Sequence, residues 1–111
     1  MPAIDWNNLG FEYIRTRCHV RSTYKDGAWG RLKLHPKDTI TMNVAATCLH
    51  YGQACFEGLK AFRCKDGKVR IFRPHANMSR MNDTANYIHC PEVPEEIFIG
   101  AVKKVVKENI D

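Results

Sequence analysis

The chain has 111 residues, of which 44% are hydrophobic and 26% are charged, and its net charge is +5. This length allows one modest domain, and these fractions are ordinary for a globular protein, which argues against a disordered chain. No apolar run approaches the roughly 20 residues that a membrane-spanning helix needs. The basic residues are scattered rather than gathered in a stripe, which argues against nucleic-acid binding.

The cysteines and histidines indicate neither a disulfide framework nor a metal site. The five cysteines are odd in number, show no Cys-x-x-Cys spacing, and are Cys18, Cys48, Cys55, Cys64 and Cys90. A paired framework would leave one cysteine over, and zinc ligands usually come in closer pairs. We therefore expect reduced, mostly buried thiols and no bound metal. Because no secretory signal is visible at the amino terminus, we expect a cytoplasmic protein.

The first part of the chain is predicted to form strands. Residues 18–24 alternate in polarity and are rich in β-branched and aromatic side chains, as strands are. Asp26-Gly27 then supplies a hairpin turn, and residues 29–34 continue as the return strand. Residues 39–44 are a third candidate strand.

The middle of the chain is predicted to change from helix to strand. Residues 45–56 are small and apolar with few charges, which favours a buried helix. Gly58 can end this helix, and residues 59–63 alternate as a strand. A second Asp-Gly turn leads into a further strand over residues 69–72.

Two helices are predicted to follow. Pro74 suits the first turn of one helix, which should end near Pro91. The other opens at Pro94 with acidic residues at its start and lysines near its end. We expect the buried faces to be Met78, Met81, Ala85 and Ile88 in the first helix, and Ile97, Ala101, Val102, Val105 and Val106 in the second. The predicted fold class is α+β, with antiparallel β-hairpins flanked by helices.

Two motifs carry a family resemblance. Residues 49–63 read LHYGQACFEGLKAFR, and residues 72–80 read FRPHANMSR. In this order they resemble the small N-terminal domain of branched-chain amino-acid aminotransferases, which are pyridoxal-phosphate enzymes of fold type IV. The resemblance runs from about residue 40 to residue 111. It implies transfer of the amino group of leucine, isoleucine or valine to 2-oxoglutarate.

The resemblance assigns roles to four side chains. Arg80 matches the arginine that holds the phosphate of pyridoxal phosphate, and a guanidinium suits this role because it offers several fixed donors without titrating. Tyr51, Phe56 and Lys60 match positions that line the substrate side of the pocket. In the family Lys60 belongs to the pocket wall and is not the lysine that binds the cofactor covalently. No catalytic residue is therefore assigned within this chain.

The resemblance also sets expectations beyond these residues. The covalent lysine and the acidic partner of the pyridine nitrogen belong to the family's larger C-terminal domain. Residues 1–111 are therefore expected to be a single small domain without that larger domain, and to be inactive alone. Relatives work as homodimers in which pocket residues cross between subunits. The expected cofactor is pyridoxal phosphate.

Three questions stay open from the sequence. Glu57 either orients a neighbour or forms a plain salt bridge. The chain could instead be a stand-alone or remnant interaction domain that pairs with a full-length aminotransferase subunit, with an exposed apolar face where the large domain normally packs. It could also come from another class IV enzyme, such as a D-amino-acid aminotransferase or an aminodeoxychorismate lyase, although the run from Phe56 to Phe62 differs from their usual motif.

Overall fold

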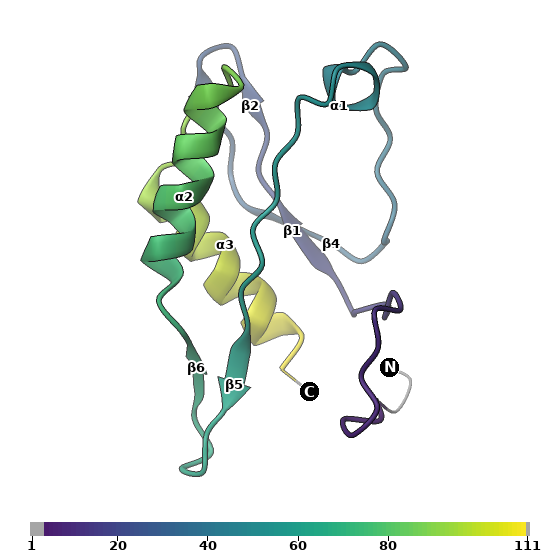
Figure 1. The fold of residues 1–111 in the computed structure, drawn as a ribbon, viewed down its shortest axis with the longest axis vertical. Helices are drawn as coiled ribbons and strands as arrows, with labels where there is room; N and C mark the ends of the chain where they lie inside the picture. The colour runs from purple at the N-terminus through teal and green to yellow at the C-terminus, as the bar shows by residue number, and fades with distance from the viewer. Residues whose placement is uncertain (1–3, 111) are drawn as a thin grey trace.

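The computed structural model describes residues 4–110, which form small antiparallel sheets flanked by helices (Figure 1). The predicted α+β class is thus confirmed. Each sheet has two strands: β1 (His19–Arg21) with β4 (Lys33–His35), β2 (Tyr24–Lys25) with β3 (Ala28–Trp29), and β5 (Ala61–Arg63) with β6 (Val69–Ile71). The helices are α1 (Thr47–His50), α2 (Pro74–Tyr87) and α3 (Glu95–Glu108).

Both predicted Asp-Gly hairpins are confirmed. Asp26 and Gly27 have φ values of 51° and 80°, and Gly67 has a φ of 78°, so each turn uses the left-handed region that glycine enters without a Cβ penalty. The predicted strand over residues 18–24 is present but divided between β1 and β2. At the division the hydroxyl of Ser22 donates to the carbonyl of Gly30 at 2.7 Å, so a side chain replaces part of the ladder.

Two of the predicted elements are wrong. Residues 39–44 form no strand. The buried helix predicted over residues 45–56 is reduced to α1, whose four residues are all exposed. Gly52 follows with a φ of 64°, which an α-helix cannot continue, so the helix ends well before Gly58.

The buried core lies where α2 and α3 pack together. Ala85 of α2, Phe98 of α3 and Val93 between the helices are the buried apolar side chains in residues 4–110. The predicted helix starts are confirmed, since Pro74 is the first residue of α2 and acidic residues open α3. The other residues of both predicted apolar faces are half-buried, and Phe98 was not among those predicted.

One side chain joins the segment before β1 to the end of α3. Asn109, directly after α3, accepts hydrogen bonds from the backbone N–H groups of Arg17 at 2.9 Å and Cys18 at 3.3 Å. Its amide also donates to the carbonyls of Cys18 at 3.1 Å and Val105 at 2.8 Å. Because the amide uses both its donor and its acceptor side, it fixes the segment before β1 against the end of α3.

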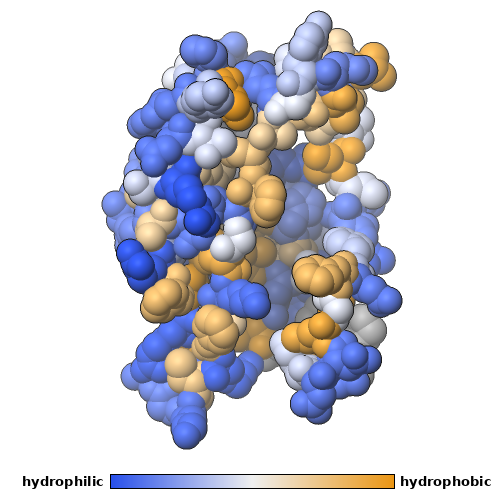
Figure 2. Space-filling view, in the orientation of Figure 1, coloured by the Kyte–Doolittle hydropathy of each residue, from blue (hydrophilic) through white to orange (hydrophobic). Residues whose placement is uncertain are grey.

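The molecule leaves much of its apolar surface uncovered. Its radius of gyration is 15.6 Å, whereas a compact chain of this length has about 13 Å. Figure 2 shows apolar side chains bordering a hollow on one face. Large exposed apolar residues include Trp6, Phe11, Tyr13, Tyr51, Phe56, Phe72 and Tyr87. Within residues 4–110 no helix has the length and apolar character that crossing a membrane requires.

Replacing Asn109 by alanine tests the hydrogen bonds that join the segment before β1 to the end of α3. We expect Asn109→Ala to lower the free energy of unfolding by about 1–3 kcal/mol, because several half-buried backbone groups lose their partner. Asn86→Ala is the matched control, since Asn86 makes one exposed hydrogen bond to Glu92 and its loss should change stability by less than about 0.5 kcal/mol. Urea denaturation measures both, and equal effects would contradict the assignment.

Candidate functional site

The segment after Gly52 runs extended beside α2, in the opposite direction to the helix (Figure 1). Gln53 donates to the carbonyl of Ile88 at the end of α2 at 2.8 Å, and Glu57 binds Arg80 two turns earlier. An extended chain covers about 13 Å from residue 53 to residue 57. Eight helical residues cover about 12 Å. The two attachments therefore match in length.

Side chains of this segment alternate between α2 and the solvent. Gln53, Cys55, Glu57 and Leu59 are half-buried, whereas the residues between them are exposed. This is the period of two that extended backbone imposes. Since Gln53 and Glu57 carry the polar contacts to α2, the same alternation directs Phe56 away from the helix.

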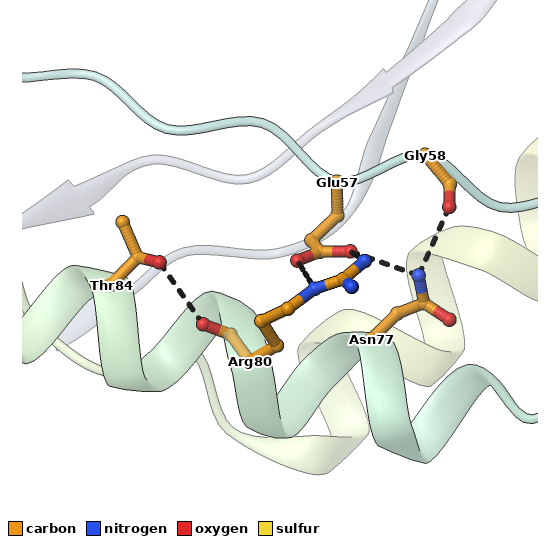
Figure 3. A network of polar contacts seen from close by, with 5 residues as sticks. All are labelled: Glu57, Gly58, Asn77, Arg80 and Thr84. Carbon is orange, nitrogen blue, oxygen red and sulfur yellow. Dashed lines mark hydrogen bonds and ion pairs between the residues drawn. The ribbon is translucent and has the colours of Figure 1, made fainter.

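Glu57 is the centre of a polar network with α2 (Figure 3). Its Oε1 accepts from Nε of Arg80 at 2.6 Å and its Oε2 accepts from Nη2 of Arg80 at 2.6 Å. Nδ2 of Asn77 donates to Oε2 of Glu57 at 2.9 Å and to the carbonyl of Gly58 at 3.0 Å. Asn77 and Arg80 lie three residues apart, which places both on one face of the helix.

The two partners differ in their exposure. The side chain of Glu57 is only 8% exposed, whereas that of Arg80 is 69% exposed. The hydrogen bonds from Arg80, and secondly the one from Asn77, lower the pKa of Glu57 to about 2. The same hydrogen bonds to Glu57 raise the pKa of Arg80. Both groups are therefore charged at neutral pH and form a bidentate ion pair.

Arg80 keeps hydrogen-bond donors for a ligand. A guanidinium has five N–H bonds, and the pair with Glu57 uses one on Nε and one on Nη2. The edge formed by one N–H from each terminal nitrogen is unused by any hydrogen bond within residues 4–110. Such an edge matches two oxygens of a phosphate or carboxylate. The residues present thus fit the phosphate group of the expected cofactor.

The other predicted site residues are exposed. Tyr51 and Phe56 are 84% and 92% exposed, and Lys60 is exposed as well. Phe56 and Lys60 share the outward side of the extended segment, and Tyr51 lies before the bend at Gly52. These three side chains therefore lie on the surface of the structure.

From the sequence, Asn77 is recognised only as part of the motif, although its spacing of three residues from Arg80 indicates that the two share a helix face.

Among the described residues, no three His, Cys, Asp or Glu side chains are placed to hold a metal ion. All five cysteines are free thiols, but the expectation that most of them are buried is wrong, because Cys48 is exposed and the other four are half-buried.

Known proteins resemble the chain throughout its length. It is 51% identical to a branched-chain-amino-acid aminotransferase of Haemophilus influenzae over 111 residues, which is 100% of this chain and 32% of that protein. The chain is similar to branched-chain-amino-acid aminotransferases. The resemblance expected from the motifs is thereby confirmed. No family model matches the chain.

Other branched-chain-amino-acid aminotransferases agree with this match. A Helicobacter pylori aminotransferase is 42% identical over 109 residues, covering 98% of this chain and 32% of that protein. Branched-chain-amino-acid transaminase 1 of Bacillus subtilis is 35% identical over 104 residues, covering 93% of this chain and 29% of that protein. The chain spans about a third of the length of these aminotransferases.

The ion pair predicts an unusual titration of Glu57. Its pKa is about 2 in the folded chain against 4.5 for the free side chain, so the pair's contribution to stability is present above pH 4.5 and is lost as the pH falls through 2. We expect the Cδ chemical shift of Glu57 to titrate near pH 2. Arg80→Ala should raise that midpoint, and a native midpoint of 4 or above would contradict the ion pair.

Proposed function

We propose that these residues form the N-terminal small domain of a branched-chain-amino-acid aminotransferase that uses pyridoxal phosphate. The observation that carries this proposal is the 51% identity across all 111 residues to an aminotransferase of that name. The substrates would be leucine, isoleucine or valine together with 2-oxoglutarate. The similarity is to the N-terminal part of such proteins.

In this proposal Arg80 binds the phosphate of the cofactor. The support is its exposed guanidinium, of which one edge is held by Glu57 and the other is available for two phosphate oxygens. Bound pyridoxal phosphate would supply the electron sink for amino-group transfer. Arg80 would hold the phosphate in place, so that the position of the ring is set by α2.

Tyr51, Phe56 and Lys60 would line the substrate side. The two aromatic side chains offer apolar walls for an aliphatic substrate, and the tyrosine hydroxyl can donate to a carboxylate. Their exposure in this structure supports a site that is completed by further protein surface. That surface would come from the larger domain of the aminotransferase and from the second subunit of a homodimer.

The uncovered apolar surface supports the same proposal. A groove of about 670 Å³ lies between the β5–β6 hairpin, the end of α3 and the N-terminal segment, and it is lined by Trp6, Phe62, Val69, Val105, Val106 and Ile110 among others. Exposed apolar side chains that gather along a groove can mark an interface. A cytoplasmic setting would suit the five free thiols, since a reducing compartment keeps cysteines unpaired.

The same surface favours a second candidate function. An interaction domain that pairs with a full-length aminotransferase subunit would also expose its apolar groove. The two candidates differ in their need for the cofactor. Such an interaction domain would keep its groove without any affinity for phosphate at Arg80.

Cofactor binding distinguishes them. We expect the chain to bind pyridoxine 5′-phosphate, which lacks the aldehyde of pyridoxal phosphate and cannot react with lysines. Arg80→Ala should weaken this binding about 10-fold or more, because it removes charge-assisted hydrogen bonds. Titration followed by amide chemical shifts measures both affinities. Binding that is identical in Arg80→Ala would contradict the assignment, and Arg70→Ala, on the distant hairpin, controls for lost positive charge.

Turnover gives a second test. We expect these 111 residues alone to form no glutamate from leucine, 2-oxoglutarate and pyridoxal phosphate. The reason is that the proposed substrate residues lie on an open surface, where Phe56 is 92% exposed, so these side chains do not shield a substrate from water. A coupled glutamate assay measures the rate, with the protein-free mixture as its control. Turnover above that background would contradict the prediction.

A further inference from the structure

We propose that Glu57 is a positioning residue for Arg80, which holds one edge of the guanidinium so that the other edge is presented to a phosphate. This inference rests on the proposed function of Arg80. The two residues meet through paired contacts of 2.6 Å, and the side chain of Glu57 is much less exposed than that of Arg80. Because the side chain of Glu57 is enclosed by the protein and that of Arg80 is exposed, Glu57 fixes the orientation of Arg80.

The carboxylate of Glu57 is itself held in place. Nδ2 of Asn77 donates to Oε2, and the following residue, Gly58, accepts from the same amide nitrogen. The carboxylate therefore receives three hydrogen bonds from α2, from two residues that share one face. Its orientation is set by the helix and not by the solvent.

Fixing the guanidinium reduces the conformational entropy that Arg80 loses when a ligand binds. A free arginine loses considerable rotamer freedom when it binds, and this loss weakens binding. In this chain Glu57 has already removed that freedom. The planar group then offers its unused edge in one direction, with two parallel N–H bonds that match two phosphate oxygens.

The negative charge of Glu57, in contrast, acts against phosphate binding. Its carboxylate neutralises Arg80 and repels a phosphate, so removing the charge would by itself strengthen phosphate binding. Positioning and competition thus predict opposite changes in phosphate affinity for the same substitution. If Glu57 positions Arg80, Glu57→Gln weakens binding, and if Glu57 competes with the ligand, Glu57→Gln strengthens it.

The same chain offers a matched control. Asp66 also binds an arginine through both oxygens, with Arg70 donating from Nη1 at 2.9 Å and from Nη2 at 2.6 Å. This pair lies at the turn between β5 and β6. Asp66→Asn and Glu57→Gln remove the same charge and the same kind of ion pair. A general effect of net charge would therefore appear equally in both variants.

The test is the affinity of the 111-residue chain for pyridoxine 5′-phosphate and for inorganic phosphate. We expect Glu57→Gln to weaken both by about 3- to 10-fold, and Asp66→Asn to leave both within about 2-fold of the native chain. In the absence of ligand, the Nε–H of Arg80 should exchange slowly with water in the native chain and faster in Glu57→Gln. A circular dichroism spectrum checks that each variant is folded.

The outcomes separate this inference from the proposed function. Unchanged or tighter binding in Glu57→Gln, with binding abolished in Arg80→Ala, overturns the positioning role and leaves the proposed function standing. No binding to the native chain overturns both. If Glu57→Gln does not fold, Asn77→Ala replaces it, since this variant keeps both charges but loosens Glu57. Weaker binding in Asn77→Ala then supports positioning, and unchanged binding overturns it.

Discussion

The attachment of the extended segment to α2 is the constraint on which the motif region depends. Glu57 joins this segment to Arg80 and Asn77, and Gln53 joins it to the end of the helix. These contacts decide which side chains of residues 53–60 face inward. Because neighbouring side chains of an extended segment point to opposite sides, the inward position of Glu57 directs Phe56 outward.

Polar contacts have this importance because the apolar core is small. Only three apolar side chains are buried in residues 4–110, and all three lie near the contact between α2 and α3. The β5–β6 hairpin and the N-terminal segment lie at the margins of this core (Figure 1). Their positions depend more on individual hydrogen bonds, such as those of Asn109, than on packing.

Local sequence signals predicted what is local in the structure. The Asp-Gly turns, the proline at the start of α2 and the charges along α3 each act within a few residues, and each was confirmed. The helix over residues 45–56 was wrong because the partners of Gln53 and Glu57 lie 20 to 35 residues away, where no periodicity reveals them. The motif drew attention to Arg80, but the bidentate partner became visible only in three dimensions.

The separation of the contacting residues along the chain implies an order of assembly. Glu57 and Arg80 are 23 residues apart, whereas Asn109 binds Cys18 across 91 residues. Closing the longer loop costs about 1 kcal/mol more in chain entropy, and it also requires α3 to be complete. The pair of Glu57 and Arg80 can thus form while the N-terminal segment is still free, because chain entropy favours the contact that closes the shorter loop.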